Sequence, residues 1–244
     1  MASRMISEVT RTVRFRPDEA AVSIRRAEWR TAVAWIAVIV AGSGVYGASI
    51  GLWRSPLQAV FVAVKMPLLI LATLSINAFL NGVLAALLGS GLSFRQTAMA
   101  ILQSFALFSL MVGALGPIAV FFTSSLPGAA EPGGDVCYRI LLLSHTVIIA
   151  VAGLMANLRL LRLLAVLSSA GTARIVLAAW LAGNLFAGAQ LSYTFRPFFG
   201  TPTLPVQFLR PNPLEGNFYE AVWGIAAGLG RRTVTETSTI PTEH

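Results

Sequence analysis

The placement of acidic residues constrains this chain more than any other feature. No Asp or Glu occurs between Glu28 and Glu131, and none occurs between Asp135 and Glu215. A water-soluble fold needs charged surface along its whole length, so acid-free stretches of this length indicate a surface that faces lipid. Only 11% of the residues are charged, against about 25% in a typical soluble domain. We therefore expect an integral membrane protein.

Five apolar segments can each cross the hydrocarbon core, which is roughly 30 Å thick and takes about 20 helical residues. The expected spans are 32–53, 67–88, 95–121, 138–158 and 173–193. Lys65 and Pro67 divide a longer apolar run, so an interfacial helix over 56–65 should precede the second span. The predicted fold class is an all-α, polytopic transmembrane helix bundle.

Local signals mark where several of these helices begin and end. Ser55 and Ser93 precede apolar runs and can cap the first turn of a helix. Pro117 should kink or end the third span, because proline removes a backbone donor. The glycine-rich turn at 89–91 should end the second span, since glycine readily adopts the left-handed conformation of a helix C-terminus.

Three regions follow from this pattern. Residues 1–30 are expected to form a cytoplasmic N-terminal segment, 31–194 the transmembrane bundle, and 195–244 a Pro/aromatic-rich tail that is disordered at its end. In the first region, Pro17 should start an amphipathic helix over 18–30. Either its apolar residues touch lipid while its arginines face phosphates, or the helix is solvated. These apolar residues are Ala21, Ile24 and Trp29.

The basic residues predict the orientation. The net charge is +8, and the basic residues are 17 Arg and one Lys. They cluster at the ends of apolar segments rather than on a soluble module, so we exclude nucleic acid as a partner. Cytoplasmic flanks of membrane helices carry excess basic residues, and seven Arg precede the first span. We expect a multi-pass protein of a bacterial inner membrane with its N-terminus in the cytoplasm.

The predicted spans contain no carboxylate. A proton-coupled carrier usually needs buried carboxylates, and an intramembrane protease needs paired acids, a serine with histidine, or a zinc set. The single cysteine, Cys137, cannot form an internal disulfide or a metal site. We therefore expect no catalytic residue, no metal site and no cofactor, and a protein that is not an enzyme.

Polar side chains inside the spans leave two alternatives open. Asn77 and Asn81 are spaced i, i+4 and share one helix face, whereas His145 and Asn184 belong to the fourth and fifth spans. These side chains either hydrogen-bond across helices as packing residues, or they line a path for a polar solute.

Long basic side chains and small residues also favour specific contacts. Lys65, Arg159 and Arg162 can extend to lipid headgroups. Gly47 and Gly51 form a small-xxx-small pair, which lets another helix approach closely.

The tail combines five prolines over 195–213 with several aromatic residues, and this density of proline excludes a regular helix. Its aromatic and basic side chains either lie in the outer interface as a belt, form a rigid lid, or provide a docking surface for a partner. The candidate docking residues are Arg196, Phe198, Phe199 and Phe208.

A Gly-rich turn, Gly89-Ser-Gly-Leu-Ser-Phe94-Arg95, leads into a long apolar helix, and Pro117 lies near the end of that helix. With five spans after a polar N-terminus, the chain over about 56–190 resembles the Yip family, the Ypt/Rab-interacting membrane proteins and their bacterial relatives. The resemblance implies a five-helix bundle with a cytoplasmic N-terminus and no catalytic activity. Eukaryotic members are linked to vesicle traffic and prenylated GTPases. This chain lacks an Asp-Leu-Tyr-Gly segment before the bundle and adds a long tail.

We favour a non-enzymatic scaffold or assembly subunit of a membrane complex. Three features support this interpretation: small-residue helix faces, the lack of buried acids, and the tail. Its expected partners are the lipid bilayer and a membrane protein, either a different one or a second copy. The alternative is a transporter or permease subunit in which Asn77, Asn81 and His145 line a polar path.

Overall fold

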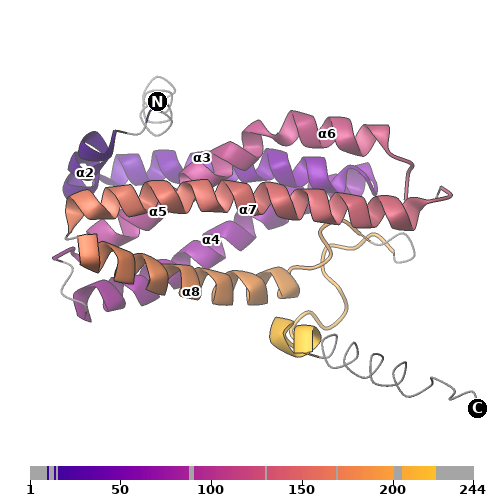
Figure 1. Ribbon diagram of the computed structural model, residues 1–244. Coiled ribbons are helices and arrows are strands. Elements are labelled where there is room, and N and C mark those ends of the chain that lie inside the picture. Colours follow the sequence, from indigo (N-terminus) through magenta and orange to yellow (C-terminus); the bar gives the residue numbers. More distant parts are fainter. Residues whose placement is uncertain are drawn as a thin grey trace, which may run out of the picture.

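The computed structural model describes Thr10, Arg14 and residues 16–87, 91–129, 131–168, 170–200 and 205–223. Regular structure in these ranges is helical, which confirms the predicted all-α class (Figure 1). The helices are α2 (Pro17–Arg26), α3 (Trp29–Gly51), α4 (Pro56–Leu87), α5 (Phe94–Ala114), α6 (Gly116–Ser125), α7 (Gly134–Leu167) and α8 (Ala170–Thr194).

Five helical segments are long and apolar enough to cross a membrane, as predicted. They are α3, α4, α7, α8 and the combined α5–α6 segment, Phe94–Ser125. Their mean hydropathy lies between 1.5 and 2.2. The chain is therefore a multi-pass integral membrane protein.

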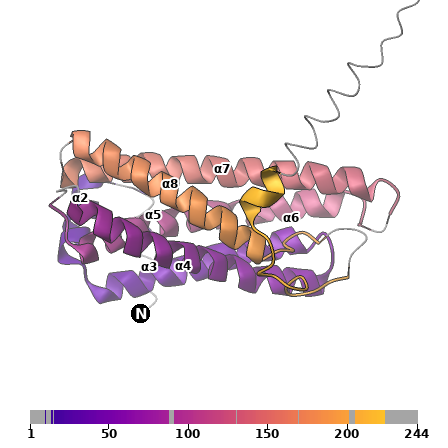
Figure 2. The same cartoon turned by 90° about the horizontal axis from the view of Figure 1, so that it is seen from below.

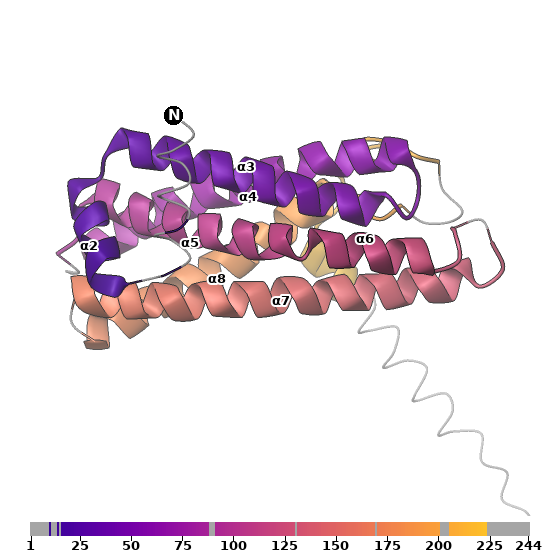
Figure 3. The ribbon, with the colours of Figure 1, turned by 90° about the horizontal axis from the view of Figure 1, so that it is seen from above.

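The bundle has two ends that differ in what they hold. One end, here called the α2 end, holds α2, the last turns of α4 and α7, and the first turns of α5 and α8 (Figure 1). The other, the tail end, holds the α3–α4 connection, the start of α7 and the segment that follows α8. Figure 3 shows α3 alongside α4 and α5, with α6 continuing from α5.

Helix α4 corrects the expected boundary at Lys65 and Pro67. The predicted interfacial helix over 56–65 and the predicted second span are a single helix. This helix, α4, has 32 residues and contains Pro67 in its interior. Proline removes the backbone bond to Ala63, four residues earlier. Gly44 of α3 packs beside that carbonyl, and neighbouring helices commonly let membrane helices tolerate such a loss.

The other local signals gave the expected helix ends. Ser55 Oγ accepts from Gln58 N, and Ser93 forms a reciprocal capping box with Gln96. The third span breaks between α5 and α6, where Pro117 occupies the first turn of the new helix. Residues 88–90, including most of the predicted glycine-rich turn, lie outside the described ranges.

Glycines bring α3 into direct backbone contact with its neighbours. A Cβ atom added to Gly47 would lie 2.5 Å from the carbonyl oxygen of Val62, and one added to Gly51 would lie 2.5 Å from that of Gln58. Gly42 meets α5 in the same way, at 2.3 Å from the Ser109 oxygen. The small-residue face of α3 is therefore occupied by α4 of the same chain.

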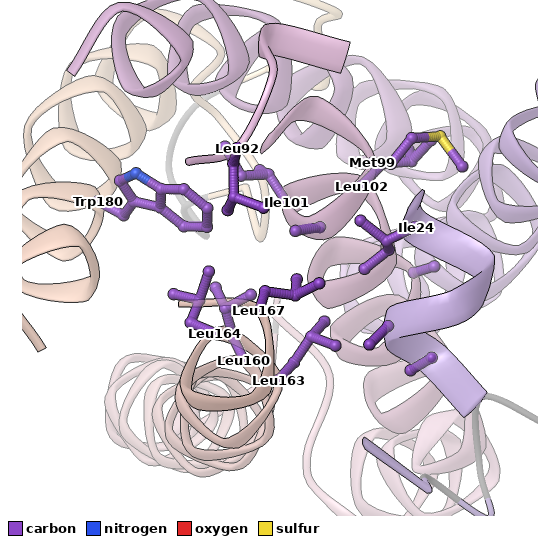
Figure 4. Close-up of a cluster of buried hydrophobic side chains, with 14 of the residues drawn as sticks. Ile24, Leu92, Met99, Ile101, Leu102, Leu160, Leu163, Leu164, Leu167 and Trp180 are labelled. Carbon is purple, nitrogen blue, oxygen red and sulfur yellow. The ribbon is translucent and has the colours of Figure 1, made fainter. Parts of the chain in front are cut away.

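One face of helix α2 packs against the bundle. Ala20, Ala21 and Ile24 are buried in a cluster that includes Leu163 of α7, and Figure 4 shows Ile24 among these side chains. Neither alternative, lipid contact or solvation, holds for Ala21 and Ile24, because the ends of α5 and α7 offer an apolar surface that covers them. Trp29, which starts α3, is exposed.

Replacing Gly47 with alanine should destabilise the bundle, because the new methyl group overlaps the α4 backbone. Overpacking of this kind typically costs about 1–3 kcal/mol. Gly153 of α7 is the matched control, since a Cβ there meets nothing within 4 Å and alanine favours a helix by about 1 kcal/mol. Thermal unfolding in detergent should show a lower Tm for Gly47→Ala and an unchanged or higher Tm for Gly153→Ala. Equal shifts would contradict the close packing.

Candidate functional site

The segment after α8 turns back across the tail end and is held there by two side chains of α4. Gln58 Nε2 donates to the carbonyl oxygens of Pro197, at 3.1 Å, and Phe198, at 3.0 Å. Lys65 Nζ donates to the same Pro197 oxygen. Gln58 and Lys65 are both 0% exposed, and their spacing of seven residues places them two turns apart on one face of α4. Two N–H donors therefore converge on one oxygen atom.

The charge of Lys65 faces aromatic rings. Its Nζ lies 5.7 Å from the ring centre of Phe198 and 5.3 Å from that of Phe208, within the range of cation–π attraction. Within the described part of the chain, no ion pair involves Lys65. In this conformation the tail covers Lys65, and its contact with lipid headgroups stays a prediction.

Phe198 and Phe199 dock onto the chain's own bundle. Both pack against an apolar cluster that includes Tyr46 and Val62, and Phe199 also contacts the rings of Tyr138 and His145. Both side chains are partly buried in this conformation, and their role in docking a partner or in forming a lid stays a prediction.

The other two candidate docking residues are more exposed. Phe208 is 37% exposed and contacts Phe61 of α4 edge to face, with ring centres 5.5 Å apart. Arg196 lies over the ring of Tyr193, at 3.8 Å, and Arg210 lies 4.4 Å from the same ring centre. Arg196 Nε also donates to the Tyr193 carbonyl.

A second anchor returns the tail to α8. Phe218 N donates to Gln190 Oε1, and the Tyr219 hydroxyl donates to the Phe186 carbonyl. An open hollow of about 580 Å³ lies here, between α8 and the helical turn at 218–223. The sequence pattern did not single out Gln190 or Gln58. One signal could have identified Gln58. It is an amide on an otherwise apolar helix, and the proline-rich tail contains carbonyl groups that need such a donor.

The asparagines form one hydrogen-bonded group between α4 and α8. Asn77 Nδ2 donates to Asn184 Oδ1 at 2.8 Å and to the Thr73 carbonyl at 2.9 Å, and Asn81 Nδ2 donates to Asn77 Oδ1 at 3.3 Å. Asn77 and Asn81 are buried, and Asn184 is partly buried. These contacts are those of helix packing across the α4–α8 interface (Figure 2).

His145 belongs to a different group. Its Nδ1 shares a hydrogen bond of 2.8 Å with the Tyr46 hydroxyl of α3, and its ring is buried between Tyr46 and Phe199. The structure therefore does not bring His145 together with Asn77 and Asn81.

The remaining predicted contacts lie near the α2 end of α7. Arg162 is exposed there, and Arg159 is partly buried beside Gln103. Their role as headgroup contacts stays a prediction. Among the residues that the structure describes, no group of three or more His, Cys, Asp or Glu side chains could hold a metal ion.

Asn77 and Asn184 should be energetically coupled. Replacing either one with leucine leaves the other without its partner, so the double variant should cost less than the sum of the single variants. Interhelical hydrogen bonds in membranes average about 0.6 kcal/mol and reach about 1.7 kcal/mol, which sets the expected coupling. Unfolding of Asn77→Leu, Asn184→Leu and the double variant measures it. Asn157, which bonds the Gly153 carbonyl of its own helix, is the control and should show no coupling to Asn77.

Comparisons with known proteins do not identify this chain. No protein-family model matches the sequence. No curated protein and no solved structure matches it.

Proposed function

We propose that this protein is a non-enzymatic scaffold or assembly subunit of a membrane complex, and that the outer faces of α7 and α8 contact its partner. The proposal rests on the small buried fraction of these two helices. Only 22% of the apolar window of α7 and 17% of that of α8 is buried, against 44% for α3.

The uncovered faces are apolar and suited to close packing. On α8, Ala178 and Ala182 are exposed and four residues apart, which is the spacing that lets helices approach closely. Large apolar side chains flank them on both helices. They include Leu143, Leu154, Ile175, Leu185 and Phe186.

The polar residues of the spans also support an assembly role. The asparagine group joins α4 to α8, and the Tyr46–His145 pair joins α3 to α7. These side chains are engaged inside the bundle, so the outer faces of α7 and α8 are left for recognition by shape and apolar packing. The transporter alternative has no comparable support, because its three residues lie in two separate groups.

The arrangement of charge supports the proposed orientation. Exposed Arg25, Arg26 and Arg162 lie at the α2 end together with Arg95 and Arg174. We propose that this end faces the cytoplasm of a bacterial cell, as the positive-inside rule favours. The lack of enzymatic activity and the resemblance to the Yip family stay predictions.

Site-specific photo-crosslinking at native expression tests the assembly proposal. A photoreactive residue in place of Leu143 or Leu185, on the exposed faces of α7 and α8, should give a discrete protein adduct. Phe79 is a matched control, because it is equally exposed but lies on α4. It should give lipid adducts alone. If all three positions give lipid adducts alone, and mild extraction yields a single-copy particle, the proposal is wrong.

A further inference from the structure

We propose that Lys65 and Gln58 form a binding site for the phosphate of an anionic lipid headgroup, and that the tail segment 196–200 is a detachable lid over that site. In the closed form, the Pro197 carbonyl oxygen occupies the position of a phosphate oxygen. This inference does not depend on the assembly role.

The two converging donors fit an oxygen that carries negative charge. Lys65 Nζ and Gln58 Nε2 both donate to the Pro197 oxygen, although a peptide oxygen has no charge to neutralise the buried ammonium. Burying a charge without an opposite charge is unfavourable, and a phosphate adds a Coulombic attraction to the ammonium that a peptide oxygen lacks. A phosphate would therefore be a better ligand at this position than the tail.

Gln58 also offers an acceptor to a hydroxyl on the headgroup. Its Nε2 donates to two tail carbonyls, which fixes the orientation of the amide. Its Oε1 is then left buried, with no hydrogen-bond partner in the described part of the chain. A donor on the ligand would satisfy this acceptor. The site thus fits a phosphate next to a hydroxyl, as in phosphatidylglycerol.

The tail, not the bundle, is what hides Lys65 from lipid. Phe61 and Leu68 lie four residues before and three residues after Lys65 and so share its helix face, and Val64 is its neighbour in the sequence. Val64 is 49% exposed and Leu68 is 45% exposed, whereas Lys65 is 0% exposed. The side chains over its ammonium are Phe198 and Phe208 of the tail. Without the tail, Lys65 would lie at the edge of the lipid-facing surface.

The depth of Lys65 suits a headgroup. A helix of 32 residues such as α4 is about 48 Å long, against a hydrocarbon core of roughly 30 Å, so a centred helix extends about 9 Å beyond each side. Lys65 lies nine residues after Pro56, about 14 Å along the axis. It would be about 5 Å inside the hydrocarbon boundary, within the reach of an extended lysine.

The lid is attached in a way that allows it to leave. It crosses the end of the bundle where α3 connects to α4, outside any helix (Figure 2). The contacts that hold it include the Gln58 and Lys65 bonds, the packing of Phe198 and Phe199, and a bond from Arg210 N to the Arg196 carbonyl. A phosphate at Lys65 would remove the two bonds to Pro197 at once.

The single cysteine of the sequence reports on the lid. Cys137 is buried in a cluster against which Phe199 packs, so lifting the lid should expose its thiol. The full chain is reconstituted in nanodiscs of phosphatidylcholine, with or without phosphatidylglycerol, and maleimide labelling of Cys137 is timed. We expect labelling on the order of tenfold faster with phosphatidylglycerol, the factor that corresponds to about 1.4 kcal/mol.

Variants assign the effect to the site. Lys65→Met keeps the length of the side chain and removes its charge, and Gln58→Glu places a carboxylate beside Lys65 that repels phosphate. Each should abolish the dependence on phosphatidylglycerol, whatever its basal rate. Arg139→Met is the matched control, because it removes an exposed charge from the same end of the bundle and should leave the dependence intact.

Three results would overturn the proposal. Equal labelling rates of the unmodified chain in both membranes would exclude a lid that phosphatidylglycerol opens. An acceleration that persists in both Lys65→Met and Gln58→Glu would place the effect elsewhere. If inorganic phosphate added to phosphatidylcholine nanodiscs accelerates labelling in a Lys65-dependent way, the site binds the free ion and the lipid assignment fails.

Discussion

Direct contact between the backbones of α3 and α4 is the constraint on which the rest of the structure depends. Lipid is as apolar as the helices, so burial of apolar surface does not drive the helices together. Close van der Waals packing has to hold them together instead. Gly47 and Gly51 supply that packing along α3, and Gly42 does so toward α5. Because these contacts fix the rotation of α4 about its axis, they also determine that Gln58 and Lys65 face the tail.

The tail completes a core that the helices leave unfinished. Helix α8 packs against α4 and α7 and does not extend to the interior around Tyr46. Phe198 and Phe199 fill that position instead, so the cluster at this end combines helix residues with irregular chain. Backbone outside a helix is tolerated at membrane depth only where protein or water satisfies its polar groups. Gln58 and Lys65 perform that role for the Pro197 carbonyl.

The features that sequence could predict are those set by neighbours along the chain. The five spans follow from apolar length, the break at Pro117 from a missing donor, and the start at Ser93 from its capping box with Gln96. Contacts across long stretches of sequence could not be predicted. Lys65 meets a segment 132 residues later, so the local pattern around it suggested an exposed side chain. For the same reason the sequence left Ile24 between lipid and water, since its neighbours in the structure belong to α5 and α7.

The order of synthesis separates the helices around Lys65 from the segment that covers it. Every helix that surrounds Lys65 leaves the ribosome before the segment that covers it, and chains fold progressively as they are made. The helices around Lys65 can therefore come together while no tail residue yet covers its side chain.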